Sequence, residues 1–356
     1  MRKLLTYTLC VLLSLSLAGC SPGYTRYQKS IYDAFDTHIM VLGYARNQAE
    51  FDRWAQTIHH ELRRLHILYD IYNDYDGINN LKTINDNAGG APVEVDQAII
   101  DLLAFAKSAY RESSGVVNVA LGSVLRIWHS YRQEGISSPQ TASLPPIEFL
   151  SAAMAHTNIQ DVVIDQENRT VFLRDGQMSL DVGALAKGFA VQRAMELAGK
   201  SGFSSGLING GGDIRITGSP RSGRDYWTVG VRNPAANSDD DQGDSLYDTL
   251  LLSGEMAVAT SGDYQRYYTV DGARYSHIID PTTLMPADRY AGVTAIHPDA
   301  GMAEMLSTAV FILPQEEGAR LLARHGGQAI WIFSDGSSTE TGGYSAFSQS
   351  GRDQNH

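Results

Sequence analysis

Four segments of the sequence hold side chains of the types and spacings that phosphate or proton chemistry uses. The first, residues 181–189, reads DVGALAKGF, and we expect a strand to end at Asp181 and a helix to begin a few residues later. The first turn of a helix offers free N–H groups that suit an anion, and Lys187 on that turn could reach a phosphate or a ring oxygen. Taken alone, Asp181 is equally consistent with a simple helix cap.

The second segment, residues 209–213, reads NGGGD and follows another expected strand. Three consecutive glycines allow either a tight turn between two strands or a close approach of the backbone to a bound group. The tight turn is the commoner of the two, so the glycines by themselves do not define a site.

The third segment joins residues 259–268, which contain Ser261, Arg266 and three tyrosines, to residues 277–281, which read HIIDP. His277 comes just before a turn that Pro281 would enforce. Histidine titrates near neutral pH and is the usual side chain for taking a proton from a hydroxyl. A lone histidine is more often structural, but a place beside a polar turn favours a functional role for His277.

The fourth segment, residues 303–309, carries Glu304 and Thr308 four positions apart, so the two side chains share one face of an expected helix. A carboxylate and a hydroxyl on one face can bind a hard divalent cation such as Mg²⁺, which keeps its other positions for waters and phosphate oxygens. The alternative is a solvated glutamate beside a threonine that bonds back to its own helix.

The amino-acid composition argues against several classes of protein function. The chain has 356 residues with 28 Lys and Arg against 40 Asp and Glu, a formal net charge of −12, which argues against nucleic acid as the main partner. Hydrophobic residues make up 43% and charged residues 19%, as in a globular protein. The two cysteines, Cys10 and Cys20, exclude a disulfide scaffold and a cysteine-based metal site.

The N-terminus has the pattern of an export signal. Arg2 and Lys3 precede an apolar stretch at residues 4–17 that is shorter than the ~20 residues of a spanning helix. Residues 17–20, LAGC, resemble a bacterial lipoprotein box, which predicts removal of residues 1–19 and lipidation of Cys20. We therefore expect an exported protein that is lipid-anchored to the cell membrane, on its periplasmic or extracellular face. The alternative is ordinary cleavage with a free Cys20.

The elements that must position these segments indicate an α+β fold with mixed sheets and packed helices. Residues 20–30 are expected to be a tether, 31–336 one catalytic domain, and 337–356 a polar, frayed C-terminal tail. Expected helices are 47–69, one beginning after Asp96, 184–199, 300–312 and 315–325, and expected strands include 31–42, 161–165, 170–174, 206–209, 213–217, 227–231, 250–253, 292–297 and 329–333. Because strands and helices do not alternate regularly, a doubly wound sheet is not indicated.

In this order and spacing, the segments resemble the ApbE-like FAD:protein FMN transferases. Residues 35–37 (FDT), Tyr72 and residues 115–118 (GVVN) add to the resemblance, which runs from Tyr32 to Phe333. The resemblance implies an α+β fold related to the T-fold that binds FAD and Mg²⁺. Such an enzyme breaks the FAD pyrophosphate, releases AMP and moves FMN onto a threonine or serine hydroxyl of an acceptor, typically the FMN-binding domain of a membrane-linked redox protein.

The resemblance also implies roles for single residues. His277 would be the base that takes the proton of the acceptor hydroxyl. The metal ligands would be the Ala184 carbonyl, Glu304 and Thr308, with Ser307 near them. The FAD-binding residues would be Phe35, Tyr72, Val116, Val117, Asn118, Asp181, Lys187 and Ile279, to which we add Ser261 and Arg266 from the third segment. Phe35 stands where the family more often has methionine, and Glu304 where it more often has aspartate.

Three other functions are compatible with the sequence. One is an FAD pyrophosphatase of the same fold, which would release FMN and AMP to water. A second is a flavin-binding lipoprotein without catalysis, which would need the pocket but neither His277 nor the metal pair. A third is an extracellular solute-binding protein, for which a lipoprotein box is equally suitable.

Overall fold

The computed structural model describes residues 23–236 and 245–353. The expected signal segment with Cys20, and residues 237–244 of an acidic stretch expected to form an exposed loop, lie outside the described residues. Within the described residues, no helix has both the length and the apolar character needed to cross a membrane.

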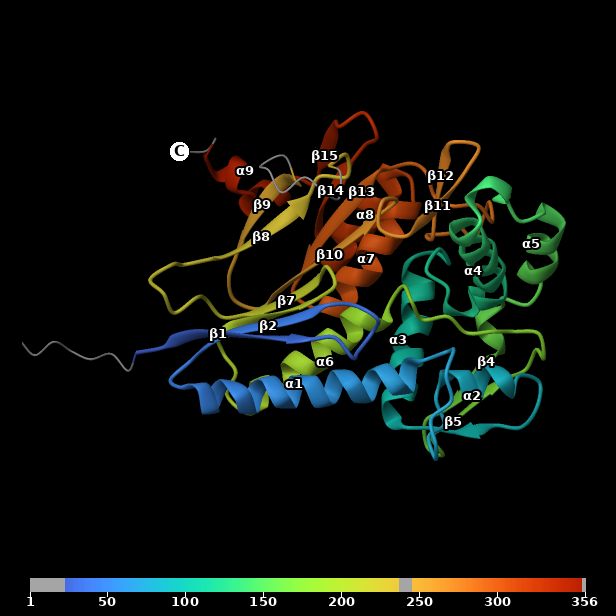
Figure 1. Ribbon diagram of the computed structural model, residues 1–356, viewed down its shortest axis with the longest axis horizontal. Helices are drawn as coiled ribbons and strands as arrows, with labels where there is room; N and C mark the ends of the chain where they lie inside the picture. Colours follow the sequence, from blue (N-terminus) through green and yellow to red (C-terminus); the bar gives the residue numbers. More distant parts are fainter. Residues whose placement is uncertain (1–22, 237–244, 354–356) are drawn as a thin grey trace, which may run out of the picture.

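An eight-stranded antiparallel sheet forms the body of the molecule (Figure 1). Its strand order is β1-β2-β6-β7-β10-β13-β14-β15. The strands are β1 (Thr25–Ile31), β2 (Ile39–Ala45), β6 (Gly206–Gly210), β7 (Asp213–Thr217), β10 (Met256–Gly262), β13 (Gly292–His297), β14 (Gln328–Ile332) and β15 (Ser338–Glu340). Successive side chains point to opposite faces of a strand, so β10 gives Ala257 to one core and Val258 to another.

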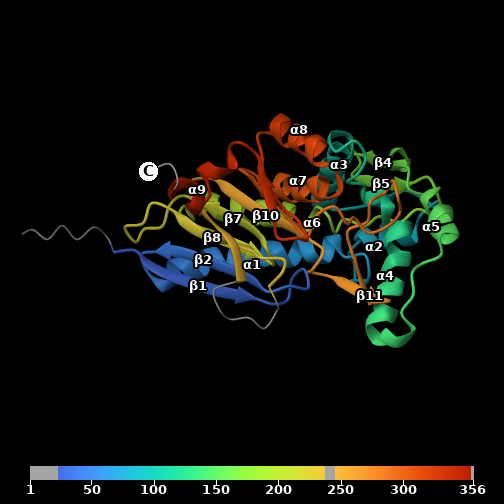
Figure 2. The ribbon, with the colours of Figure 1, turned by 90° about the horizontal axis from the view of Figure 1, so that it is seen from above.

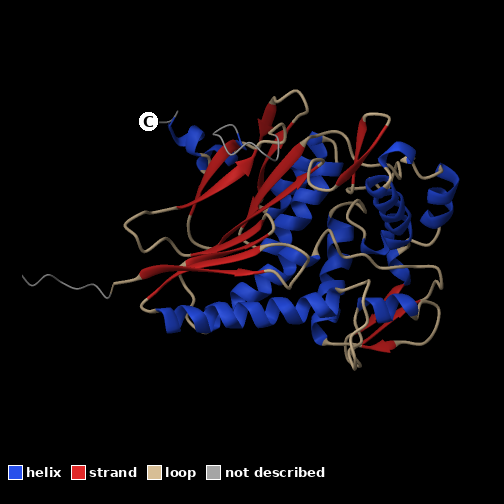
Figure 3. Ribbon diagram, in the orientation of Figure 1, coloured by secondary structure: helices blue, strands red, loops and turns tan. Residues whose placement is uncertain are grey.

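Helices cover one face of this sheet. They are α1 (Gln48–Tyr69), α6 (Ala186–Lys200) and α7 (Ala300–Ile312), with α8 (Gln315–His325) packed on α7. In α1 the apolar residues recur at three- and four-residue spacing and are buried, as Phe51, Ile58 and Leu62 show, and the Asn47 side chain caps the helix start. Figure 3 shows these helices in blue beside the red strands.

The opposite face of the sheet is covered by the hairpin of β8 (Trp227–Arg232) and β9 (Leu246–Leu252), which Figure 2 shows from above. Its apolar residues pack with Ile216, Val258 and Tyr344 in a second core. The sheet is therefore apolar on both faces, which explains why its strands do not show a clean alternation of apolar and polar residues.

A second region lies at the right of Figure 1. Its helices are α2 (Leu81–Asp86), α3 (Gln97–Glu112), α4 (Gly122–Ser137) and α5 (Ile147–Met154). Its strands form a small sheet, in the order β3 (Val93–Glu94), β5 (Thr170–Leu173) and β4 (Val162–Asp165), and a hairpin of β11 (Tyr267–Val270) and β12 (Ala273–Ser276). The Trp128 indole N–H donates to the Leu284 carbonyl at 2.9 Å, and buried Tyr268 packs against Gly135 of α4. These contacts fix α4 beside the β11–β12 hairpin and the turn that follows His277.

The prediction of one strand over residues 31–42 is wrong, and part of the expected tether belongs to β1. The chain turns between β1 and β2, where Phe35 and Asp36 have positive φ angles of 56° and 48°. Phe35 therefore lies in a turn and not on a strand. β1 is a largely exposed edge strand, so its polar composition hides it from a search for apolar runs.

The expectation of a frayed tail is also wrong for residues 337–353. β15 pairs with β14, and α9 (Gln349–Asp353) packs near β9. Tyr344 is fully buried and its hydroxyl donates to Asp248 Oδ2 at 3.0 Å. A single buried aromatic residue outweighs the polar composition of this segment, because it anchors the segment to the second core.

Candidate functional site

A cavity of about 880 Å³ opens where the large sheet, the start of α6, the middle and end of α7, and the wall formed by α4 meet. Each catalytic, flavin-binding and metal-binding residue predicted from the sequence lines it. These residues are Phe35, Tyr72, Val116, Val117, Asn118, Asp181, Ala184, Lys187, Ser261, Arg266, His277, Ile279, Glu304, Ser307 and Thr308. The structure thus brings the four segments together, while the role of each residue remains a prediction.

A buried carboxylate pair with one ammonium group lies at the inner end of the cavity. Lys187 Nζ contacts Asp213 Oδ2 and lies 3.0 Å from Glu304 Oε1. The Gly188 backbone N–H donates to Glu304 Oε2 at 2.9 Å. The side chains of Asp213 and Glu304 are only 6% and 5% exposed, so Glu304 is not the solvated residue of the alternative interpretation.

Two glycines decide how this centre is assembled. A Cβ atom on Gly188 would lie 2.4 Å from the Ala300 carbonyl oxygen and 2.8 Å from Glu304 Cβ, so α6 and α7 can approach this closely only at a glycine. Gly211, with a φ of +68°, forms the tight turn between β6 and β7, and its Cβ position would lie 2.3 Å from Thr37 Oγ1. The glycine run is therefore a tight turn that also leaves room for the Thr37 side chain. The turn places Asp213 in contact with Lys187.

Burial and charge act in opposite directions on this centre. Burial alone would lower the pKa of Lys187, but the charges of Asp213 and Glu304 outweigh it and raise that pKa. Burial raises the pKa of Glu304 to about 7 although Lys187 opposes the shift, and Asp213 adds to it. Two buried carboxylates thus share one ammonium group, which leaves the centre short of positive charge.

This centre changes two expectations. The Lys187 ammonium, expected to reach a phosphate or a ring oxygen, is held between two carboxylates. Asp213 is the last residue of the glycine-rich motif, and the motif alone does not assign it to the site. Its signal in the sequence is its position directly after the glycine run.

Three hydroxyls adjoin the carboxylates. Ser261 Oγ lies 3.1 Å from Ser307 Oγ and 3.5 Å from Thr308 Oγ1. The Ser307 hydroxyl also donates to the Glu304 carbonyl at 2.9 Å, so it is Ser307, one residue before the expected threonine, that bonds back to the helix. Thr308 stays half-buried on the same face of α7 as Glu304, with its hydroxyl in the cavity.

Among the described residues, one ring nitrogen of His277 has no hydrogen-bond partner. Its Nδ1 lies 3.2 Å from the Arg266 carbonyl oxygen, which can only accept, so Nδ1 carries the proton and Nε2 keeps a lone pair. Burial lowers the pKa of His277 to about 4, and the charges of Arg266 and Arg132 add to this effect. His277 is therefore neutral near pH 7 and able to accept a proton.

Asp181 does not cap a helix. α6 begins at Ala186 after Leu185, whereas the Asp181 side chain accepts from the Gly183 N–H at 2.8 Å in the preceding turn. Burial raises the pKa of Asp181, and that single N–H only partly offsets the effect. The cap interpretation is thus not supported, and the Asp181 side chain lines the cavity.

One wall of the cavity was not predicted. α4 contributes Leu125, His129 and Arg132, which lie on one helical face. Arg132 Nη2 donates to His129 Nδ1 at 3.1 Å, and the rings of His129 and Tyr72 lie 5.6 Å apart between centroids. The three-and-four-residue spacing of these residues was the available signal, but the helix itself was not identified.

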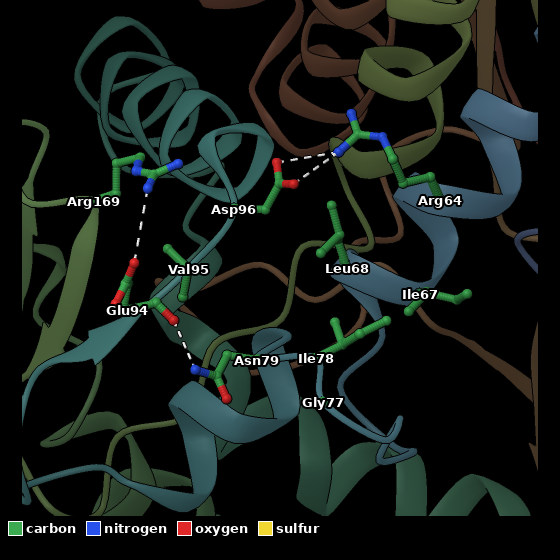
Figure 4. Close-up of a pocket in the computed structure, with 10 residues that line it drawn as sticks. All are labelled: Arg64, Ile67, Leu68, Gly77, Ile78, Asn79, Glu94, Val95, Asp96 and Arg169. Atoms are coloured by element: carbon green, nitrogen blue, oxygen red, sulfur yellow. Dashed lines mark hydrogen bonds and ion pairs between the residues drawn. The ribbon is translucent and has the colours of Figure 1, made fainter.

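A second, smaller hollow of about 450 Å³ lies between the end of α1 and β3 (Figure 4). The charged groups around it are already paired. Arg64 lies 3.1 Å from Asp96, Arg169 lies 3.8 Å from Glu94, and Asn79 donates to the Glu94 carbonyl. None of the residues predicted to form the site lines this hollow.

Comparisons with known proteins match this chain to one family. Residues 26–332 match the model of the ApbE family. The FAD:protein FMN transferases of Klebsiella pneumoniae (strain 342) and Treponema pallidum (strain Nichols) are 32% and 33% identical over 70% and 72% of this chain, and 73% and 71% of their own lengths.

Solved structures extend the comparison to the fold. The ApbE protein from Thermotoga maritima superposes with a TM-score of 0.79 at 28% identity, covering 91% of this chain and 100% of that one. The flavin transferase ApbE from Vibrio cholerae, at 22% identity, shares the fold with a TM-score of 0.75 and the same coverage. The predicted α+β architecture is therefore confirmed.

Proposed function

Since this chain belongs to the ApbE family and is an FAD:protein FMN transferase, we propose that its 880 Å³ cavity moves FMN from FAD to a threonine or serine hydroxyl of an acceptor flavoprotein and releases AMP. One observation carries this assignment of the site. A neutral histidine with a free Nε2 faces the same cavity as a carboxylate and hydroxyl centre that lacks positive charge.

In phosphoryl transfer the protein contributes little covalent chemistry, because its main tasks are to neutralise charge and to align the attacking oxygen. The oxygen of the acceptor hydroxyl forms a bond to the FMN phosphorus, and His277 Nε2 accepts the proton of that hydroxyl. The bond from that phosphorus to the AMP oxygen breaks, and AMP leaves with the electron pair. The Arg266 carbonyl holds the Nδ1 proton and so keeps the ring in the required tautomer.

The residues around Glu304 fit a hard divalent cation. The donors are all oxygens, from the Ala184 carbonyl, the Glu304 carboxylate and the Thr308 hydroxyl, and two carboxylates here share one ammonium group. Within the described residues, no cluster of three or more His, Cys, Asp or Glu could hold a metal by itself. We therefore propose Mg²⁺ bound by few protein ligands, which would neutralise charge on the pyrophosphate oxygens when bound.

The rest of the cavity provides surfaces for the rings of FAD. Phe35 lies in the turn between β1 and β2, and the exposed Tyr72 also lines the cavity. Residues 116–118, Asp181 and Ile279 line the space beside them. We propose that these residues, with Ser261 and Arg266, bind FAD.

We further propose that Cys20 is lipidated and anchors the exported enzyme at the membrane, where its acceptor would be the FMN-binding domain of a membrane-linked redox protein. The LAGC pattern at residues 17–20 supports this. Metabolic labelling with a palmitate analogue tests it. Labelling of wild type and not of Cys20→Ala is expected, and equal labelling of both would contradict the anchor.

The transfer itself is tested by incubating the protein with FAD, Mg²⁺ and a candidate acceptor domain. The acceptor should gain the mass of one FMN in phosphoester linkage, with one AMP released per label, and an acceptor lacking the hydroxyl should stay unlabelled. FMN and AMP without acceptor labelling would point to a pyrophosphatase. Flavin binding without any AMP would point to a non-catalytic flavin-binding protein.

Metal dependence is tested on Glu304. Glu304→Asp should keep activity, whereas Glu304→Ala should lose most activity at limiting metal and regain part of it at high metal. The same metal titration for Glu304→Ala and wild type would show that the carboxylate is not a ligand.

A further inference from the structure

Among the three arginines that line the cavity, Arg132 and Arg266 come from neighbouring elements, and neither has a carboxylate partner in the described part of the chain. The third, Arg232, lies over the Tyr264 ring, 5.6 Å from its centroid. Arg132 lies on α4 and Arg266 comes just before β11. We propose that Arg132 and Arg266 together form a two-guanidinium site that binds the phosphate oxygens of the FAD pyrophosphate. This inference rests on the proposed function and adds to it a binding residue, Arg132, on a helix that the sequence motifs did not include.

Packing between α4 and the hairpin brings the two arginines to the lining of the same cavity. A Cβ atom on Gly135 would lie 2.5 Å from Tyr268 Cδ2, so the buried tyrosine ring packs directly on the α4 backbone. The Tyr268 hydroxyl donates to the Ser143 carbonyl at 3.1 Å and fixes the hairpin from the other side. Arg132 lies three residues before Gly135 and Arg266 two residues before Tyr268, so this contact brings both to one rim.

The charges of these two arginines are not balanced by contacts within the protein. In residues 23–236 and 245–353, neither guanidinium forms an ion pair with a carboxylate, and the one side-chain bond of Arg132 goes to neutral His129. Arg274 on the same hairpin, by contrast, lies 3.3 Å from Asp263. Two like charges close together in a half-buried place are unfavourable unless an anion joins them.

The effects on neighbouring groups agree with an excess of positive charge here. Burial and then the charge of Arg266 lower the pKa of Arg132. The same two arginines lower the pKa of His277 after burial does. Burial raises the pKa of Asp181, and the charges of both arginines act against this shift.

Guanidinium groups match the chemistry of phosphate. Each presents several N–H donors in a planar fork that can bond two phosphate oxygens at once. His129 is a positioning residue in this arrangement. It accepts from Arg132 Nη2 and packs beside Tyr72, and so holds the guanidinium toward the cavity.

Ligand binding separates the phosphate groups from the rings. Dissociation constants for AMP, FMN, adenosine and riboflavin are measured by calorimetry, or by competition with FAD, for wild type, Arg132→Gln, Arg266→Gln and Arg132→Lys. We expect Arg132→Gln to weaken the binding of AMP or FMN by roughly 10- to 100-fold, as for a lost charge-assisted hydrogen bond. The dissociation constants of adenosine and riboflavin should stay unchanged. The nucleotide that is weakened more identifies the phosphate in contact, and Arg132→Lys should recover part of the affinity.

Two matched arginines serve as controls. Arg126 is exposed on the same helix, and Arg274 is paired on the same hairpin; neither lines the cavity. Arg126→Gln and Arg274→Gln should bind both nucleotides as wild type does. The proposal is overturned if Arg132→Gln binds AMP and FMN within twofold of wild type, or if adenosine or riboflavin is weakened as much as its nucleotide.

These outcomes are distinct from a failure of the proposed function. If wild type labels its acceptor while Arg132→Gln binds nucleotides normally, the arginine site is wrong and the transferase assignment of the cavity stands. If wild type labels no acceptor but the nucleotide losses appear, the phosphate site stands and the transfer assigned to this cavity is wrong.

Discussion

His277 owes its proposed role to its surroundings more than to its residue type. The Arg266 carbonyl fixes the tautomer, and burial together with two arginines keeps the ring neutral. An exposed histidine would be half-protonated near pH 6.5. The protein environment therefore extends the pH range in which Nε2 can accept a proton.

Replacing His277 should slow transfer without preventing FAD binding. His277→Ala is expected to lower the transfer rate by about 10²–10⁴-fold, the usual contribution of a general base, with the FAD dissociation constant within about twofold of wild type. Acceptor mass against time measures the rate, and His60→Ala, at an exposed histidine of α1, is the control. Transfer at a near wild-type rate would remove His277 from the mechanism.

The pH profile provides a second check on the same residue. Because the pKa of His277 is lowered to about 4, the reactive neutral form persists as the pH falls from 8 to 6 and is lost only as the pH approaches 4. The His277 contribution to kcat/KM for the acceptor should thus stay flat between pH 6 and 8. A decline with a midpoint near 6.5 would indicate an ordinary, solvated histidine.

Lys187 should act mainly on stability, since its ammonium neutralises two buried carboxylates. Lys187→Met is expected to cost about 3 kcal/mol of unfolding free energy, the scale for breaking a buried ion pair. Without Lys187 the pKa of Glu304 rises further above its unfolded value, so stability is kept at low pH and lost as pH rises through the folded pKa.

Denaturant unfolding at pH 5.5 and pH 8 measures this effect. The loss should be larger at pH 8, and Lys200→Met, at an exposed lysine of the same helix, should cost little at either pH. An equal loss at both pH values would show that charge pairing is not the cause.

At the scale of elements, the centre depends on how closely α6 and α7 approach. Gly188 touches Ala300 and the start of the Glu304 side chain, so an added methyl group must push the helices apart. Gly188→Ala is expected to destabilise the protein by about 1–3 kcal/mol, as overpacking does, and to raise the metal concentration needed for half-maximal activity.

Gly199 on the same helix is a matched control, because a Cβ atom there would have no neighbour within 4 Å. Gly199→Ala should stabilise the protein by roughly 0.5–1 kcal/mol through helix propensity alone. Thermal unfolding of both variants checks the pair. A Gly188→Ala variant as stable as Gly199→Ala would mean that the two helices separate at no cost.

At the scale of the whole molecule, the C-terminal segment completes the second core. Tyr344 is fully buried in the second core and bonds to Asp248, although it comes from a polar segment of the chain. Tyr344→Ala is expected to cost about 3–5 kcal/mol by loss of buried aromatic area.

Neither Tyr344 nor its hydrogen-bond partner Asp248 lines the cavity, so the nucleotide dissociation constants of folded Tyr344→Ala should stay as in wild type. Chemical denaturation and calorimetry measure the two effects separately. A variant as stable as wild type would restore the prediction of a frayed tail.

What could be predicted from the sequence is what local patterns encode. The spacing of apolar residues determined α1, and capping by Asp96 together with helical periodicity determined the start of α3. The motifs around Asp181, His277 and Glu304 predicted which residues would line one cavity, and the family comparison confirmed the fold and the transferase function. Each signal spans a few neighbouring residues, so no tertiary contact is needed to detect it.

Only the tertiary structure decided how distant segments meet. Lys187 pairs with Asp213 and Glu304, which are 26 and 117 residues away in the sequence. The residue expected to bind a phosphate therefore neutralises two carboxylates of the protein. Arg132 lines the cavity because α4 packs on Tyr268. Phe35 lies in a turn with a positive φ angle and not on the predicted strand. In each case the deciding energy comes from packing and charge between residues far apart in the chain, which local propensity does not contain.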